Sequence, residues 1–208
     1  MGVRMARPRE FDERAVLDAA VQCFWARGYE ATSVRDLAQG MGLTSASLYN
    51  AFGDKRSLYR RALDHYVEEG FADRVRRFEG VLPPRQAIGA FFDEILERSL
   101  NDPQHKGCML VNSALEASPD DPDFQRAVAA VLIQIEAFFR RCVLAGQHSG
   151  AITCAQPADD LARLLLGILL GVRVLARTRP ERELLEGMVR PALTLLDSHL
   201  NLHGDHQR

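Results

Sequence analysis

Residues 32–63 read TSVRDLAQGMGLTSASLYNAFGDKRSLYRRAL, and this stretch decides the fold class. A helix of about eight residues is predicted over 33–40, where Ser33 and Asp36 have the spacing of a capping box. A turn containing Gly42 follows, and a second helix begins at the N-capping Thr44. Glycine allows the chain to reverse, and small polar residues at the start of the second helix leave room to enter the DNA major groove. The stretch therefore predicts a helix-turn-helix.

Apolar residues in this stretch are spaced to pack the two short helices together and against an earlier helix. That earlier helix is predicted from near Asp12 to Gly28, and the helix that begins at Thr44 should end at Phe52. A fourth helix should begin after the N-cap Asp54 and continue to about residue 78, before the breaker VLPPR. The apolar positions of the motif are Val34, Leu37, Ala38, Met41, Leu43, Leu48 and Phe52.

The rest of the chain is also helical in its pattern, because no run of alternating apolar residues indicates a strand. Its helices are predicted at 84–101, 107–118, 121–146, 157–178 and 181–202. We therefore predict an all-α protein of two domains. Residues 1–55 would form a three-helix, helix-turn-helix DNA-binding domain. Residues 56–208 would form a larger helical domain for ligand binding, regulation and dimerisation, joined to the first through the fourth helix.

The charge of the chain is distributed unevenly. The 208 residues have a net charge of −2, but residues 1–61 contain ten Lys and Arg against seven Asp and Glu, which is +3 and leaves −5 for the remainder. Positive charge therefore lies at the end where DNA is expected to bind.

Several protein classes are disfavoured by composition. The longest apolar stretch, 164–172, is about half of the ~20 residues that a bilayer requires, so no membrane span is predicted. The N-terminus lacks an apolar h-region, which favours a cytoplasmic protein. The four cysteines show no C-x-x-C pair and the histidines show no metal-ligand spacing, so we predict reduced thiols, no metal site and no cofactor.

Four short patterns occur in order within residues 10–63. They are FWARGY at 24–29, T-[ST]-x-x-x-[LI]-A at 32–38, G-[LV]-[ST]-x-x-[ST]-L-Y at 42–49 and F-x-x-K-x-x-L at 52–58. Together they resemble the TetR family of transcriptional regulators. The resemblance implies a homodimer that binds a palindromic operator on double-stranded DNA, with repression as the default mode, and that responds to a small-molecule or electrophile effector.

The resemblance also implies roles for individual residues in DNA binding. Thr32 and Ser33, at a helix N-terminus, would bind a phosphate, while Arg35 and the segment Ser45–Ser47 would face the groove and read bases. The basic arm with Arg4, Arg7 and Arg9 would reach the backbone or minor groove. Tyr49 and Lys55 would contact phosphates, and Asn50 either phosphate or base. The full predicted set is Thr32, Ser33, Arg35, Thr44, Ser45, Ala46, Ser47, Tyr49, Asn50 and Lys55.

Structural roles compete with these assignments. Tyr49 is alternatively a surface-packed aromatic, and Arg35 alternatively pairs with Asp36 or Glu30. The arginines of the fourth helix fit a solvated face better than a DNA contact. For the aromatic residues Phe24, Trp25 and Tyr29, a place in the hinge and core is favoured.

The segment 161–176, LARLLLGILLGVRVLA, is apolar nearly all round, as expected of a helix that is covered on every side. Gly167 and Gly171 would leave a strip where a partner backbone can approach. Burial within one chain is the alternative to a dimer interface. The predicted interface residues are Leu164, Gly167, Ile168, Gly171, Val172, Met188 and Leu195.

Cys108 is a candidate sensor that shares a helix face with Asn112 and Glu116, although the pattern favours a buried cysteine beside capping residues over a reactive one. The sequence GCMLVNSALE is similar to a subgroup of the family, some of whose members respond to electrophiles or oxidants through such a cysteine. A buried, unreactive cysteine is the alternative. A ligand pocket would be lined by Phe91, Ile95 and Phe138, which are otherwise core residues.

Two other classes of protein are considered. An enzyme using Cys108 and His105 as nucleophile and base lacks an evident orienting residue, so no catalytic residues are predicted. A helical protein–protein adaptor would not need the phosphate-facing Thr32, Tyr49 and Lys55.

Overall fold

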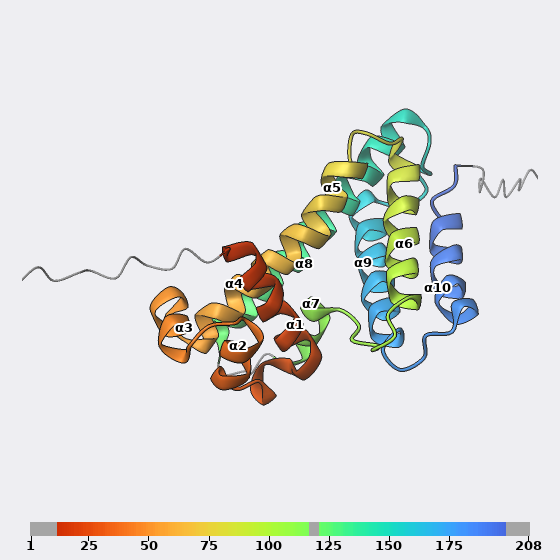
Figure 1. Ribbon diagram of the computed structural model, residues 1–208. Coiled ribbons are helices and arrows are strands. Elements are labelled where there is room, and N and C mark those ends of the chain that lie inside the picture. The colour runs from red at the N-terminus through yellow and green to blue at the C-terminus, as the bar shows by residue number, and fades with distance from the viewer. Residues whose placement is uncertain (1–11, 117–120, 199–208) are drawn as a thin grey trace, which may run out of the picture. The chain divides into compact units, whose positions relative to one another are not determined.

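The computed structural model describes residues 12–116 and 121–198, and every regular element within those residues is a helix (Figure 1). The chain divides into two compact units, one ending at Tyr66 and the other beginning at Val67. The predicted arm with Arg4, Arg7 and Arg9 lies outside the described residues.

The N-terminal unit consists of α1 (Glu13–Ala31), α2 (Val34–Gly40), α3 (Ser45–Phe52) and most of α4 (Lys55–Val67). The first three helices begin where the sequence predicts. Asp12, Ser33 and Thr44 each accept a hydrogen bond from backbone N–H groups of the helix that follows. Asp54 likewise accepts a hydrogen bond of 2.6 Å from the Ser57 amide at the start of α4.

The turn between α2 and α3 is a glycine-dependent helix cap. Gly42 has φ +64°, and the amide of Leu43 donates to the Ala38 carbonyl over 2.9 Å. This is the bonding of a Schellman motif, in which a left-handed residue satisfies the last helical carbonyls. The reversal allows side chains from both helices and from α1 and α4 to meet in one core. Fully buried members of this core are Phe24, Leu37, Leu48, Leu58 and Leu63.

The predicted fourth helix contains an irregularity. After α4 the chain forms a π-helical segment, η1 (Glu68–Ala72), and then α5 (Asp73–Phe78), so that the Asp73 amide bonds to the Glu68 carbonyl five residues earlier. Phe71, within η1, contacts the rings of Phe91 and Phe138 at centroid distances of 6.4 and 6.1 Å. The sequence pattern did not indicate this segment.

The C-terminal unit continues with α6 (Pro84–Leu100), α7 (Met109–Glu116), α8 (Pro122–Ser149), α9 (Ala158–Leu175) and α10 (Arg182–Thr194). Helices α6 and α9 pack against each other and each packs against α8 and α10, while α7 packs on α8 and α9 (Figure 1). Their core is rich in aromatic rings: Phe91 lies 5.3 Å from Phe138 and 5.2 Å from Phe139, and Phe92 stacks on Phe139 at 5.6 Å.

Helix α10 ends at Thr194, which is earlier than the predicted residue 202. The chain turns at Leu195, and the carbonyl of Leu196 accepts a hydrogen bond from the Thr153 amide. Asp197 pairs with Arg85 at the start of α6 over 3.0 Å. A helix that continued to residue 202 would place the Leu196 carbonyl and the Asp197 carboxylate elsewhere, and these two contacts would be lost.

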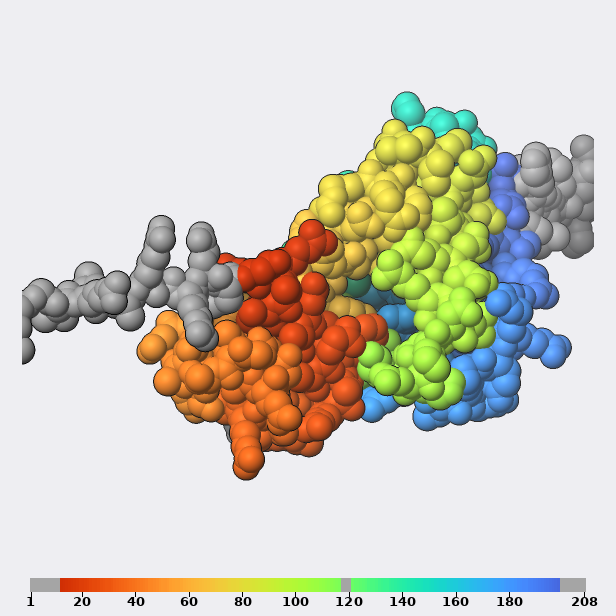
Figure 2. All heavy atoms as spheres, in the orientation of Figure 1, coloured from red at the N-terminus to blue at the C-terminus, as the bar shows by residue number. Residues whose placement is uncertain are grey.

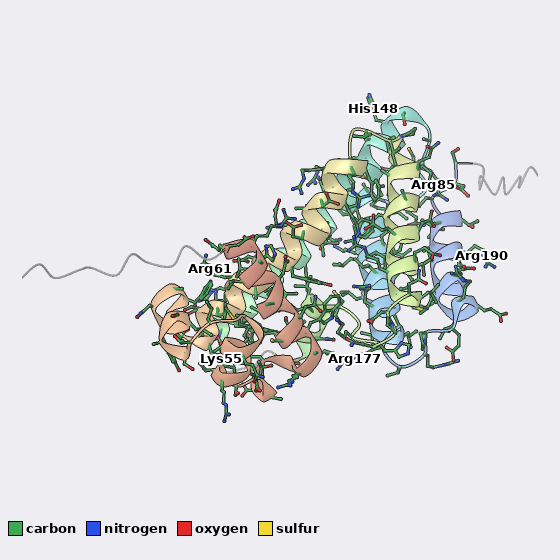
Figure 3. All side chains as sticks on the ribbon, viewed as in Figure 1. Lys55, Arg61, Arg85, His148, Arg177 and Arg190 are labelled. Atoms are coloured by element: carbon green, nitrogen blue, oxygen red, sulfur yellow. The ribbon has the colours of Figure 1, made fainter. Side chains whose placement is uncertain are left out.

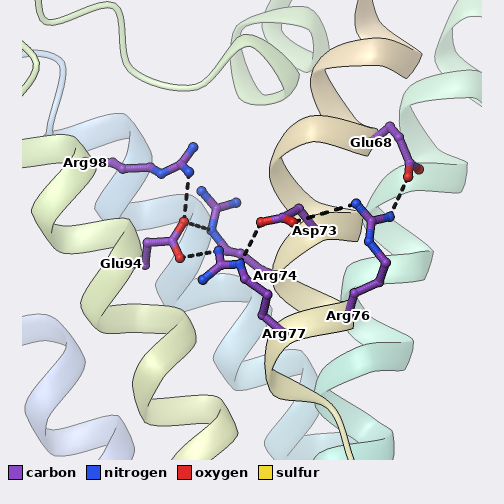
Figure 4. Close-up of polar contacts among 7 residues, drawn as sticks. All are labelled: Glu68, Asp73, Arg74, Arg76, Arg77, Glu94 and Arg98. Carbon is purple, nitrogen blue, oxygen red and sulfur yellow. Dashed lines mark hydrogen bonds and ion pairs between the residues drawn. The ribbon is translucent and has the colours of Figure 1, made fainter. Parts of the chain in front are cut away.

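A cluster of charged residues joins α5 to α6 (Figure 4). The Glu94 carboxylate accepts hydrogen bonds from Arg74 Nε (2.9 Å) and an Arg77 NH group (2.5 Å), and it pairs with Arg98 at 3.0 Å. Burial opposes ionisation of Glu94, but the Arg77 hydrogen bond and the three positive charges outweigh it and lower the pKa of the carboxyl. Arg74 of α5 is itself buried, and its ion pair with Glu94 connects α5 to α6.

None of the helices in the described part of the chain combines the length and the apolar character needed to cross a membrane.

Candidate nucleic-acid interface

Helix α3 has one buried and one exposed face. Leu48 and Phe52 are buried, whereas Ser45, Ala46, Ser47 and Asn50 are exposed and Tyr49 retains 49% of its accessible surface. Figure 2 shows the α2–α3 stretch, in orange, on the outer surface of its unit. The exposed face carries two hydroxyls, an amide and a phenol. These groups donate and accept hydrogen bonds, and most are small enough for a DNA groove.

Thr44 caps the N-terminus of α3. Its hydroxyl accepts a hydrogen bond of 3.1 Å from the Ser47 amide and lies 2.9 Å from the Ser47 hydroxyl. The first residues of α3 are therefore held in helical geometry without bulky side chains. The predicted exposure of residues 44–47 agrees with this arrangement.

The N-terminus of α2 already holds an anion. The Ser33 hydroxyl donates to the Asp36 carboxylate over 2.6 Å and the Ser33 amide donates over 3.1 Å, while Arg27 pairs with the same carboxylate at 3.0 Å. These hydrogen bonds from Ser33, followed by that from Arg27, lower the pKa of Asp36 to about 2. Arg27 is thus the partner of Asp36, and Arg35 is exposed.

The prediction that the Thr32 side chain faces a phosphate is corrected by the structure. Thr32 is fully buried, and its hydroxyl donates to the Gly28 carbonyl over 2.6 Å. Its amide is directed to the Tyr29 carbonyl at 3.4 Å. Both donors of Thr32 therefore bond within the protein. Because α1 is interrupted at Gly28, the Gly28 carbonyl requires a hydrogen-bond donor, and the Thr32 hydroxyl supplies it.

Lys55 begins α4 and is labelled in Figure 3. Its ammonium lies 4.3 Å from the centre of the Tyr29 ring and 3.5 Å from the Glu30 carbonyl oxygen. Arg61, also labelled there, pairs with Glu13 and lies over the Phe52 ring at 4.8 Å, which accords with a structural role. Arg56 and Arg60 are exposed.

Taken together, the exposed residues of α2 and α3 offer hydrogen-bonding groups at the helix turn, and Lys55 adds a cation at the start of α4. This combination suits a duplex, whose grooves are read by small polar groups and whose phosphates are held by cations. Comparison with known proteins points the same way. Residues 16–62 match the family described as "Bacterial regulatory proteins, tetR family", and residues 84–191 match the "Tetracyclin repressor-like, C-terminal domain".

The chain belongs to the TetR family.

As a TetR-family member, the chain is a helix-turn-helix transcriptional regulator, and the resemblance seen in residues 10–63 is confirmed. It is 33% identical over 196 residues to the uncharacterised HTH-type transcriptional regulator YezE of Bacillus subtilis, covering 93% of this chain and all of that protein. It is 30% identical over 172 residues to the HTH-type transcriptional repressor ComR of Escherichia coli, covering 82% of each.

Solved TetR-family structures agree. A cysteine mutant of the regulator CifR, in complex with 26-base-pair double-stranded operator DNA, is 32% identical and superposes with a TM-score of 0.81, covering 90% of this chain and 98% of that one. The reduced form of Escherichia coli NemR has the same fold, with a TM-score of 0.81 at 19% identity.

The predicted dimer residues of this TetR-family chain lie partly on an exposed apolar surface of α9 and of the residue that follows α10. Leu164 and Leu195 each keep 39% of their surface, Gly167 is exposed, and Ile168 is partly exposed. Val172 is fully buried within the chain, so its assignment to the interface is corrected: it points from α9 into the core of its own subunit.

Gly171 also has a role within the subunit. A Cβ atom placed on Gly171 would lie 2.9 Å from the terminal methyl of Met188, whereas one on Gly167 would meet nothing within 4 Å. The absence of a side chain at Gly171 therefore leaves room for Met188 of α10. Of the two glycines, only Gly167 has open space beside it.

The predicted effector residues are separated into two groups. Phe91, Ile95 and Phe138 are buried in the aromatic core. Cys108 precedes α7 and is half-buried, and Glu116, at the other end of α7, is exposed. Helix α7 begins at Met109 and not at the predicted residue 107, because Gly107 has φ +72°, which is not a helical conformation.

Asn112 links the segment before Cys108 to the turn that follows α9. Its amide donates to the Lys106 carbonyl over 3.0 Å, and its oxygen accepts from Arg177 over 3.1 Å. Arg177 is labelled in Figure 3. Sequence reasoning missed Arg177, and it also missed Arg173, which is buried in α9 and donates to the Ser99 hydroxyl over 3.0 Å. An arginine inside an otherwise apolar helix was the available indication of a buried polar contact.

Proposed function

We propose that this TetR-family regulator is a repressor that binds a palindromic operator as a homodimer and releases it in response to an effector. The observation that carries the proposal is the exposed face of α3, with Ser45, Ser47, Tyr49 and Asn50 directed outward from a buried Leu48. A single such helix reads few base pairs, so two copies related by a two-fold axis are needed for specificity.

Within this proposal the segment 44–47 and Arg35 approach base edges, while Tyr49 and Lys55 contact phosphates. The Ser33 side chain takes part less directly, because its hydroxyl caps α2 and bonds to Asp36. Base contacts supply sequence preference, and phosphate contacts supply affinity that declines with salt.

The homodimer is proposed to form through the apolar face that Leu164, Gly167, Ile168 and Leu195 present. Leucines exposed on α9 and just after the end of α10 are typical of a surface that a partner covers. Among the similar proteins, ComR is a transcriptional repressor and CifR binds operator DNA. A DNA regulator of this kind would act in the cytoplasm and would not be an enzyme.

The effector is proposed to act on the C-terminal unit, either through Cys108 or through a ligand that displaces part of the aromatic core. Both routes would favour a conformation with lower affinity for the operator, and only differential binding to the two conformations produces release.

The proposal is tested by selecting bound fragments from random duplex DNA and titrating the selected fragment at several salt concentrations. We expect salt-sensitive binding that Tyr49→Ala and Lys55→Ala weaken. Arg126→Ala is the matched control, since it removes an arginine of α8 whose side chain is 72% exposed. Absence of salt-sensitive affinity for any duplex would refute the proposal, and intact binding by Tyr49→Ala would favour an adaptor that contacts protein instead.

A further inference from the structure

Helix α1 is interrupted one turn before its end. Gly28 has φ 79° and ψ 172°, a conformation that is essentially restricted to glycine. The buried hydroxyl of Thr32 donates to the Gly28 carbonyl over 2.6 Å and thereby closes the interruption. The sequence FWARGYEAT therefore forms a bend between α1 and α2 that this hydrogen bond stabilises.

The bend presents two groups to Lys55. The Tyr29 ring centre lies 4.3 Å from the ammonium, and the Glu30 carbonyl oxygen lies 3.5 Å from it. Tyr29 is held in turn by Tyr59, at a centroid distance of 4.9 Å. The ring that faces Lys55 is thus supported from the core of the unit.

We propose that Tyr29 is a positioning residue for DNA binding: the bend at Gly28 and Thr32 sets its ring, and the ring holds the Lys55 ammonium where a DNA phosphate binds. The proposal rests on the proposed function, in which Lys55 contacts a phosphate. It assigns roles in DNA binding to Tyr29 and to the buried Thr32, which does not contact DNA itself.

The physical reason lies in the lysine side chain. A free lysine has four rotatable bonds, and ordering it at a phosphate costs conformational entropy. An aromatic face attracts the ammonium without neutralising it, because the ring bears no net charge. The ammonium has three N–H donors, so donors remain for a phosphate when one is directed to Glu30. A carboxylate in place of the ring would hold Lys55 equally well but would repel the phosphate.

Two other roles for Tyr29 predict different results. If the phenol itself binds a phosphate, Tyr29→Phe will weaken binding as much as Tyr29→Leu. If Tyr29 only fills the core, Tyr29→Leu will weaken binding to the same extent whether or not Lys55 is present. Our proposal predicts that Tyr29→Phe and Tyr29→Trp bind like the wild type.

The experiment is a double-mutant cycle on the full chain, with the selected duplex and a random duplex titrated over a salt series. We expect Lys55→Ala to weaken both complexes about equally and to reduce the salt slope by about one unit. Tyr29→Leu should weaken binding roughly 3–10-fold when Lys55 is present, and by less than about twofold in the Lys55→Ala background. Thr32→Val should behave like Tyr29→Leu, and Thr32→Ser like the wild type.

NMR of the free protein tests the contact between Tyr29 and Lys55 directly, without relying on DNA affinity or on the stability of the variants. Protons on the Lys55 side chain should be shifted upfield by the Tyr29 ring current, should remain so in Tyr29→Phe, and should lose that shift in Tyr29→Leu. Thermal unfolding identifies any variant that fails to fold. In that case Tyr29→Phe and Thr32→Ser, which should bind like the wild type, test the proposal.

The inference is overturned if Tyr29→Leu is neutral, if its effect is undiminished in the Lys55→Ala background, or if Lys55→Ala leaves the salt slope unchanged. The proposed function fails separately, when the wild-type protein shows no salt-sensitive affinity for DNA.

Discussion

The carboxylate of Glu68 accepts a hydrogen bond of 2.5 Å from Arg76, although the two residues are eight positions apart. In a regular α-helix, residues eight apart differ in direction by about 80°. The π-helical segment between them contains more residues in each turn, which returns Arg76 to nearly the same side as Glu68 (Figure 4). The ion pair is therefore specific to the π-helical geometry of this segment.

Replacing Glu68 by Gln should loosen the π-helical segment without unfolding the protein. Both side chains are about 60% exposed (61% and 59%), so the pair contributes only about 0–1 kcal/mol to the free energy of unfolding. Hydrogen exchange at the Asp73 amide, which bonds to the Glu68 carbonyl, should nevertheless become faster. Unchanged exchange at this amide in Glu68→Gln would show that the pair does not maintain the segment.

Replacing Glu94 by Gln should destabilise the protein by roughly 3 kcal/mol, since it removes the carboxylate that pairs with the buried Arg74. Chemical denaturation of the two proteins measures the difference. The control is Glu97→Gln on the same helix: Glu97 is 55% exposed and pairs with Arg182, so its loss should cost less than about 1 kcal/mol.

The stabilisation by Glu94 should also depend on pH. Its pKa is lowered in the folded protein, so the contribution is fully present above the ordinary value of 4.5 and is lost as the pH falls through the lowered pKa. The stability difference between wild type and Glu94→Gln should therefore shrink in acid. A difference that stays constant across this range contradicts the ion-pair explanation.

Asp36 should titrate with a midpoint of about 2, because it is held ionised first by Ser33 and then by Arg27. Its folded pKa is below the ordinary 3.8, so the contribution of the Asp36 carboxylate to the cap of α2 is complete above 3.8 and is lost as the pH falls through about 2. A carboxyl-detected NMR titration measures this. Ser33→Ala should raise the midpoint more than Arg27→Ala, and the reverse order would disprove the assigned causes.

A charge at Gly167 should prevent dimer formation while leaving the subunit folded. The space beside Gly167 is open in the subunit, so Gly167→Glu creates no internal clash but places a carboxylate on the apolar face. Analytical ultracentrifugation should detect monomers, and operator affinity should fall steeply. The control Ala130→Glu adds the same group to an exposed position of α8 and should remain dimeric. A dimeric Gly167→Glu protein would locate the interface elsewhere.

Alkylation by iodoacetamide should separate the cysteines by environment. Burial raises the pKa of Cys142 to about 12, whereas Cys154 is exposed, so Cys154 should react more than about a hundredfold faster. The proposed sensor Cys108 should react faster than either. Equal or slower labelling of Cys108 would reject the sensor, and unfolding in urea, which exposes all the thiols, provides the reference rates.

The sequence alone predicted the helix-turn-helix and most helix boundaries, because these depend on contacts between residues close in the chain. Ser33 with Asp36, and Thr44 with Ser47, form caps across three residues, and Gly42 supplies the left-handed turn. The exposed face of α3 follows from the same helical period that buries Leu48.

Only the tertiary structure decided how residues distant in the sequence are used. Thr32 has the residue type and position of a phosphate ligand, but the interruption of α1 at Gly28 turns its hydroxyl inward. Gly171 and Val172 fit a dimer pattern, but Met188 and the core of the subunit occupy their surroundings. The meeting of Tyr29 with Lys55 likewise needs the bend and the packing of α4. Local patterns determine where helices begin and which face is apolar, whereas the partner of each face is determined by long-range packing that a single sequence does not specify.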